Sequence, residues 1–454
     1  MAGQTKRVVM IGAGLTGLSA AVRLRAHGVV VTVLESSAQA GGAVRSEQTE
    51  GFLVEDGPNS MMTNEPDVQE FLRTAGLEEE MVSPSAKKRF LVRHGRPVAL
   101  PAGPVGAVTT PLFSLPGKLR VLGEPWVRRG REEDESLADL VRRRLGPEVL
   151  AYAIEPFVAG IYAGDPEKLS ARWAFPKLWN LERAHGSFIR GALRLRRSGP
   201  PPKMFSFRQG MGALPARLAE MLGPDLHCGV RVEKISRHAQ GWQVEWSSGG
   251  QSTAVSADAV ITTAPAFAVP DLPWSADLSS SLEFLREIVY PSVTVVALGF
   301  RRADVTHPLD GFGMLVPAAE QRRILGTIFS SSLFPGRAPE DHVLLTTFVG
   351  GARQPRLAEL GDDALEQDVC SDLRELLGVR GTPVFRRIVR WPRAIPQYHT
   401  GYGKHLEAME KLEFAWPGLH LAGNYRGGIA AGQCIQNGLR LAEKLAPASS
   451  VSAP

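Results

Sequence analysis

The sequence predicts an α/β chain, α+β overall, that combines a parallel-sheet domain, a mixed-sheet domain and an inserted helical domain. Three observations predict this fold: strand-like and helical runs alternate over residues 7–34, strand-like runs return from Val230 onward, and the stretch between them has mainly helical spacing. The 454 residues are enough for two or three cores, and 44% hydrophobic with 22% charged residues is typical of a globular protein.

The first element is a βαβ unit. It consists of an apolar strand, a helix that ends at Gly28, and a second apolar strand, at Arg7–Ile11, Leu15–His27 and Val29–Leu34. This order is typical of a Rossmann-like domain, in which the turn between strand and helix binds a dinucleotide.

That turn carries a complete glycine motif, Gly12-Ala13-Gly14-Leu15-Thr16-Gly17. Gly12 permits a tight turn, Gly14 lets a pyrophosphate approach the backbone, and Gly17 lets the helix pack closely on the strand. The helix N-terminus offers free N–H groups to phosphates. An acid, Glu35, followed by Ser36, stands at the end of the second strand, where it can bind ribose hydroxyls. We therefore expect a dinucleotide site.

Two further segments favour FAD over NAD. The first contains a glycine pair, an arginine and a second turn: Gly41, Gly42, Arg45, and Gly57-Pro58-Asn59-Ser60. Such turns bring the backbone close to a long cofactor, and the arginine can contact phosphate or flavin oxygens. The second is the turn at 423–432, with Ile429, Ala430 and Ala431, between a strand and the final helix. The N-terminus of that helix can stabilise negative charge on a reduced flavin.

The remaining elements follow in order. Residues from Pro66 to about Arg208 are expected to be mainly helical, with loops at 101–116 and 197–202. Later strands are expected at Val232–Ile235, Gly241–Trp246, Ala259–Thr263, Val293–Phe300, Gly313–Val316, Leu325–Phe329, Val343–Val349 and Leu419–Ala422, and a last helix at Gly432–Leu445. The predicted domains are a FAD-binding domain (1–65, 210–265 and 410–447), a substrate-binding domain (266–409 with part of 66–95), a helical domain (96–209) and a disordered tail (448–454).

The charge and the cysteine content argue against a nucleic-acid-binding protein and against a disulfide-rich secreted protein. The net charge of +5 comes without a Lys/Arg-rich tail or zinc-type cluster, so we expect no nucleic-acid partner. Three widely spaced cysteines, Cys228, Cys370 and Cys434, are typical of a reducing, cytoplasmic location. We also expect no signal peptide, no metal site and no spanning helix, because no apolar run reaches about 20 residues.

Together these segments resemble the flavin amine-oxidase-like superfamily and, within it, the protoporphyrinogen oxidases. The resemblance covers nearly the whole chain and rests on Gly160–Asp165, Asp310–Pro317, Thr346–Gly351 and Arg390–Tyr398. It implies non-covalent FAD, held by the glycine segments above together with Val232 and Trp391. The superfamily usually has arginine where this chain has Gln39, and often a basic residue where it has Ala43, which leaves Arg45 as the substitute.

The resemblance also implies the reaction: oxidation of a porphyrinogen for haem synthesis, with O2 as acceptor and hydrogen peroxide as product. Arg93 would bind a substrate propionate, and Phe312, Leu315, Ile328 and Phe348 would enclose the macrocycle, with backbone contact at Gly313. A flat apolar ring with carboxylates needs apolar walls and a guanidinium. No general base is predicted, because Asn59 cannot act as one and His94 and Tyr398 are undecided.

Several alternatives stay open. Protoporphyrinogen IX is the expected substrate, but coproporphyrinogen III, with four propionates instead of two, is the alternative that Lys87, Lys88 and Arg89 beside Arg93 keep open. More distant alternatives for the function are an amine oxidase, a carotenoid desaturase or a non-catalytic FAD-binding protein. The apolar stretch 99–115 and the basic cluster after it suit either a peripheral membrane contact or a soluble helical lid. A homodimer is also left open.

Overall fold

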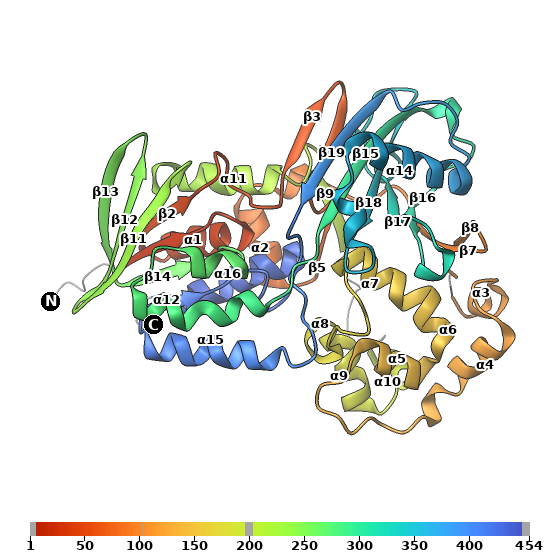
Figure 1. Cartoon of the computed structure of the whole chain (residues 1–454), viewed down its shortest axis with the longest axis horizontal. Coiled ribbons are helices and arrows are strands. Elements are labelled where there is room, and N and C mark those ends of the chain that lie inside the picture. Colours follow the sequence, from red (N-terminus) through yellow and green to blue (C-terminus); the bar gives the residue numbers. More distant parts are fainter. Residues whose placement is uncertain (1–5, 102, 196–202, 447–454) are drawn as a thin grey trace, which may run out of the picture.

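The computed structural model describes residues 6–101, 103–195 and 203–446. Figure 1 shows a parallel sheet with helices α1 and α16 at one end of the molecule, a large mixed sheet at the other end, and helices α3 to α10 beneath that mixed sheet. The predicted combination of a parallel sheet, a mixed sheet and a helical part is confirmed. The predicted loop at 197–202 and the tail at 448–454 lie outside the described residues.

The parallel sheet draws its five strands from three distant parts of the sequence. Their order is β10 (Leu226–Cys228), β2 (Val30–Glu35), β1 (Arg7–Ile11), β14 (Ala259–Thr262) and β20 (Leu419–Leu421). The central strand β1 is apolar from Val8 onward, and Val8 to Ile11 are buried, as a parallel strand covered on both faces requires. Helices α1 (Leu15–Ala26) and α16 (Ala431–Leu445) pack together beside this sheet, where the Ser19 hydroxyl reaches the Ile435 carbonyl.

The mixed sheet has seven strands. Their order is β19 (Phe385–Trp391), β15 (Val293–Arg301), β18 (His342–Gly350), β17 (Ile324–Phe329), β16 (Gly311–Leu315), β7 (Lys88–Arg93) and β8 (Arg96–Ala99). All neighbours are antiparallel except β16 and β7. Helix α14 (Asp362–Leu377) buries one face of this sheet against Leu298, Leu345 and Met314. The opposite face is covered in part, by a β3–β4 hairpin at one end and by α7 at the other.

Three small sheets and a group of helices complete the fold. The small sheets are β11–β12–β13 (Arg231–His238, Gly241–Ser248, Gln251–Ala257), β3–β4 (Ser46–Thr49, Phe52–Glu55) and β5–β9–β6 (Met61–Thr63, Lys203–Phe207, Met81–Val82). The helical part comprises α3 (Gly103–Thr109), α4 (Leu115–Leu122), α5 (Leu137–Leu145), α6 (Pro147–Val149), a π-helical turn (Leu150–Ile154), α7 (Glu155–Tyr162), α8 (Ala171–Ala174), α9 (Pro176–His185) and α10 (Phe188–Leu195). The other helices are α2 (Pro66–Thr74), α11 (Ala213–Leu222), α12 (Ala276–Leu282), α13 (Ser330–Leu333) and α15 (Gly403–Ala415).

The stretch from Pro66 to Arg208 is mainly helical, as expected, but it also contains four short strands, β6 to β9. The expectation of a loop at 101–116 is wrong, because this segment contains α3 and the start of α4. β7 has three consecutive buried residues, of which Phe90 and Val92 lie in the core under α14, and its parallel partner β16 comes more than 200 residues later. Strand β8 is the edge of the mixed sheet, although the predicted boundary placed it in the helical part. The division into domains otherwise stays a prediction.

Candidate active site

The turn between β1 and α1 has the shape that a dinucleotide motif needs. Gly12 adopts a φ of +105°, and a Cβ there would lie 2.8 Å from Thr263 Oγ1. A Cβ on Gly17 would lie 2.2 Å from the Gly12 carbonyl oxygen, so α1 can approach the turn only with glycine here. A Cβ on Gly14 would meet no described atom within 4 Å. Helix α1 therefore follows an N-cap residue, Gly14, that leaves room for a phosphate to approach the backbone ahead of Leu15 and Thr16.

Glu35 closes this turn from the end of β2. Its buried carboxylate accepts hydrogen bonds from the backbone N–H groups of Ala13 and Ser37, both at 2.8 Å. Ser36 lies beside it, with its hydroxyl 3.4 Å from the same carboxylate. The Val230 N–H donates to the Glu35 carbonyl at 3.0 Å, so the chain leading to Val232 passes beside the acid. The acid is thus fixed at the position that a ribose hydroxyl would contact.

The segment around Arg45 packs against the glycine turn. The Gly41 N–H donates to the Ala13 carbonyl at 2.8 Å, and a Cβ on Gly42 would lie 3.5 Å from Gly14 Cα. The Nε of Arg45 is buried and finds no acceptor among residues 6–101, 103–195 and 203–446. Buried donors are nearly always bonded, so this atom fits a cofactor oxygen.

The turn before α16 is held by Tyr398. Its hydroxyl donates to the Asn424 carbonyl at 2.6 Å and accepts from the Gly428 N–H at 3.0 Å. Burial raises the pKa of Tyr398 well above its ordinary value, so this phenol positions the turn and does not act as a base. Helix α16 begins after Ala430, in the segment Ile429, Ala430 and Ala431. A Cβ on Gly432 would lie 2.7 Å from the Met62 carbonyl, so this segment reaches the chain just beyond Ser60.

Strand β19 of the mixed sheet is bonded to the segment that contains Gly57 and Pro58. The Trp391 indole N–H donates to the Asp56 carbonyl at 2.8 Å, and the Arg387 guanidinium binds the Asp56 carboxylate at 2.9 to 3.1 Å. The Asn59 side-chain amide donates to the Gly57 carbonyl at 3.2 Å. Sequence reasoning missed Asp56 and Arg387; the acid directly before the Gly-Pro-Asn turn was the available signal.

The predicted substrate residues lie on one face of the mixed sheet. The register places Leu315 opposite Gly326 and Gly326 opposite Phe348, while Ile328 is two residues from Gly326 on the same strand. These three side chains are half-buried and lie on the face opposite α14. Because Gly326 has no side chain, Leu315 packs over it: a Cβ there would lie 3.1 Å from Leu315 Cδ2.

Arg93, Phe312 and Gly313 join the same face. Leu91 pairs with Leu315, and Arg93 is two residues further along β7, so strand alternation directs both to one side. The ring of Phe312 lies under the Arg89 guanidinium, 5.5 Å from its centroid, and Arg89 shares that side of β7. A Cβ on Gly313 would lie 2.3 Å from the Thr327 carbonyl. The structure therefore brings all six predicted substrate residues together, whereas His94 lies exposed in the β7–β8 turn.

Arg93 has two partners that sequence reasoning missed. Its guanidinium forms an ion pair with Glu148 of α6 at 3.0 Å and lies over the ring of Tyr152, 3.5 Å from the centroid. Tyr152 belongs to the π-helical turn Leu150–Ile154, a local geometry that is frequent at functional sites. No local pattern in the sequence signalled either contact.

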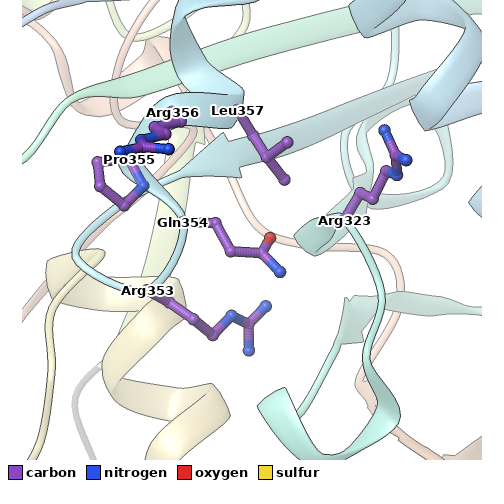
Figure 2. Close-up of a pocket in the computed structure, with 6 residues that line it drawn as sticks. All are labelled: Arg323, Arg353, Gln354, Pro355, Arg356 and Leu357. Carbon is purple, nitrogen blue, oxygen red and sulfur yellow. The ribbon is translucent and has the colours of Figure 1, made fainter.

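A separate arginine-lined cavity of about 470 Å³ opens next to the end of β18. Figure 2 shows its lining residues, Arg323, Arg353, Gln354, Pro355, Arg356 and Leu357. Arg353 is paired with Glu155 at 3.1 Å, and Arg323 is paired with Asp368. None of the predicted cofactor or substrate residues lines this cavity, and two of its three arginines already have carboxylate partners.

Comparison with known proteins agrees with the resemblance that the motifs predicted. The model of the flavin-containing amine oxidoreductase family matches residues 15–446. Protoporphyrinogen oxidase 2, chloroplastic/mitochondrial, of Arabidopsis thaliana is 38% identical over 96% of this chain and 93% of its own length. Coproporphyrinogen III oxidase of Bacillus subtilis is 29% identical over 95% of this chain and 96% of its own. The crystal structure of an Exiguobacterium sp. 255-15 protein, 25% identical, covers 97% of this chain and 98% of that chain with a TM-score of 0.83.

Proposed function

Because the chain belongs to the flavin-containing amine oxidoreductase family and, within it, to the protoporphyrinogen oxidases, we propose that it oxidises protoporphyrinogen IX to protoporphyrin IX. O2 is the acceptor and hydrogen peroxide the product, in haem synthesis. One observation carries the proposal: the half-buried row of Leu315, Ile328 and Phe348 shares a sheet face with Arg93, and β19 bonds this sheet to the segment at Gly57. The apolar row and Arg93 would thus hold the substrate on a sheet whose β19 edge is bonded to the proposed flavin-binding segment.

FAD is the proposed flavin, held without a covalent bond. The open N-terminus of α1 suits its pyrophosphate, Glu35 its ribose and the unsatisfied Nε of Arg45 its oxygens. Cys434 is buried near Ile429, and burial raises the pKa of its thiol to about 11. It therefore stays a thiol, which is a poor nucleophile toward a flavin. When bound, the flavin supplies the acceptor for a hydride and returns the electrons to O2.

The residues of this chain bind and orient the substrate. Arg93 anchors a propionate, and the apolar row holds the macrocycle parallel to the sheet face. The positive end of α16 lies at Ile429 to Ala431, where it stabilises negative charge. The proton from the substrate N–H is lost to solvent or to a base other than Tyr398, which is held as a neutral phenol.

Coproporphyrinogen III is the second candidate substrate because, of the three cations beside Arg93, only Lys88 has a carboxylate partner among the described residues. Arg89 stacks on Phe312 and forms no ion pair with any residue that the structure describes, so it is available to a further propionate. Lys88 is less available, because it is paired with Asp310. Two relatives named coproporphyrinogen III oxidase are 29% and 27% identical, below the 38% of the Arabidopsis protein.

Helices α3 and α4 support a peripheral membrane contact. Leu115, Leu119 and Leu122 follow helical spacing along α4 and are 70, 60 and 62% exposed, and Trp126 just beyond is 79% exposed. Lys118 on the same helix supplies positive charge near this apolar ridge. Within the described ranges no helix combines the length and apolar character needed to cross a bilayer. A cytoplasmic location and a homodimer stay predictions.

Turnover of the two porphyrinogens tests the proposal. The flavin-loaded protein receives protoporphyrinogen IX or coproporphyrinogen III in air, and the rise of porphyrin fluorescence is compared with the spontaneous rate. Faster turnover of protoporphyrinogen is the expected result. Faster turnover of coproporphyrinogen would select the second substrate, and no acceleration of either would overturn the proposed function.

A further inference from the structure

Arg93 and Glu148 form an ion pair at the edge of the candidate substrate face. The closest nitrogen–oxygen distance is 3.0 Å, and the two side chains are only 13 and 19% exposed. The guanidinium also stacks on Tyr152, which fixes its plane. The proposed propionate anchor therefore carries a carboxylate partner from the protein itself, and the pair is close to neutral as a unit.

Glu148 is held in place from its other side. The Ser114 N–H donates to both of its carboxylate oxygens, at 3.0 and 3.1 Å, and the Ser114 hydroxyl donates at 2.7 Å. These bonds anchor the carboxylate independently of Arg93, so its negative charge stays beside the site when a ligand binds. The Arg93 Nε is buried and has no acceptor within the described part of the chain, so this N–H is free for a ligand carboxylate.

A ligand carboxylate at Arg93 must therefore bind next to a fixed negative charge. Charge repulsion in a partly buried site is screened less than in water, and it sums over all the charges that a ligand carries. A ligand with four carboxylates experiences more of it than a ligand with two. We propose that Glu148 is a specificity-determining residue that favours dicarboxylic over tetracarboxylic porphyrinogens by holding a fixed negative charge beside Arg93. This inference rests on the proposed function.

The test measures binding of the stable products to the flavin-loaded protein. Protoporphyrin IX and coproporphyrin III are titrated separately, and dissociation constants are taken from porphyrin fluorescence. Glu148→Gln removes the charge and keeps the side-chain shape. We expect it to tighten both ligands, by about threefold for protoporphyrin and about tenfold for coproporphyrin, and the difference should shrink at high salt. Turnover of both porphyrinogens should show the same change in KM with little change in kcat.

The chain offers a closely matched control. Glu155→Gln removes a carboxylate from the Arg353–Glu155 pair, which is 13 and 16% exposed with a distance of 3.1 Å, at the start of the next helix. Glu155 also accepts a backbone N–H, from Ala318 at 2.9 Å, so it resembles Glu148 in structural role. It does not touch Arg93, and we expect it to leave the ratio of the two dissociation constants unchanged.

A double variant separates charge from folding. Arg93→Gln leaves Glu148 without its cationic partner, and the further Glu148→Gln change should then tighten protoporphyrin by about threefold and coproporphyrin by about tenfold relative to Arg93→Gln alone. Comparing the double variant with Arg93→Gln still tests the proposal if the Glu148→Gln single variant does not fold. If the double variant binds no more tightly than Arg93→Gln, or if Glu155→Gln shifts the ratio equally, Glu148 has only a structural role. Binding without turnover by the wild type would overturn the proposed function but not this inference; no binding of either porphyrin would overturn both.

Discussion

The bond between Arg387 and Asp56 connects the mixed sheet to the proposed flavin segment, and its loss should loosen flavin binding. Arg387 makes two contacts to one carboxylate oxygen at 2.9 and 3.0 Å and one to the other at 3.1 Å. Both side chains are mostly shielded, at 24 and 13% exposure. Hydrogen bonds between charged groups contribute about 1.5–3 kcal/mol, so Arg387→Gln should lower the free energy of unfolding by about 2 kcal/mol.

Part of that loss should appear in flavin affinity, because Asp56 directly precedes Gly57. We expect about tenfold weaker FAD binding, measured by reconstituting the flavin-free protein and following flavin fluorescence. The neighbouring Arg386 is the control: it points to the other side of β19 and pairs with Asp363 and Glu366 at the surface. Arg386→Gln should change stability by less than about 1 kcal/mol and leave FAD binding unchanged. Equal effects of the two substitutions on FAD affinity would refute the reasoning.

Three more predictions follow. Burial raises the pKa of the Glu55 carboxyl to about 6, so protonation of this group stabilises the fold fully below pH 4.5, and this stabilisation is lost as the pH rises through 6. Glu55→Gln should remove this pH dependence, up to about 2 kcal/mol in the free energy of unfolding, measured by denaturation at pH 4.5 and 7. Identical pH profiles of the wild type and the variant would contradict this prediction. Arg144 is fully buried between Glu124 and Glu182, so Arg144→Ala should lower the free energy of unfolding by about 3–5 kcal/mol, measured with heat or urea. Arg142 is exposed, and Arg142→Ala should lower it by less than about 1 kcal/mol. Similar losses in the two variants would contradict this prediction. Leu119→Ser with Leu122→Ser should weaken sedimentation with anionic vesicles without changing the melting temperature, and unchanged sedimentation would refute the membrane contact.

The parts of the fold that follow from local sequence were predictable. The first βαβ unit has its apolar periods, its glycine turn and its terminal acid within 35 residues, and the structure has β1 at the predicted Arg7–Ile11. The last helix was similarly visible from the strand and glycine turn before it. In both cases the sequence motif and the secondary structure that it predicts lie within the same short segment of the chain.

Long-range pairing could not be predicted in the same way. β7 and β8 form a local hairpin, which sequence reasoning missed, but the position of β7 in the mixed sheet depends on β16, more than 200 residues away. The Asp56–Arg387 bond likewise joins residues 331 positions apart. The predicted substrate residues came from resemblance to a family, whereas the sheet register shows that they share one face. Glu148 carries no sequence signal, because a single acid after Gly-Pro is common at any helix start.

The most direct test of the central claim is anaerobic reduction of the bound flavin. The flavin-loaded protein is mixed with protoporphyrinogen IX without oxygen, and the yellow flavin absorbance is followed before and after air is admitted. The proposed function predicts bleaching on mixing, the appearance of porphyrin fluorescence, and recovery of the yellow colour with formation of hydrogen peroxide. A flavin that stays yellow with both porphyrinogens would contradict it and leave a flavin-binding protein with a different substrate.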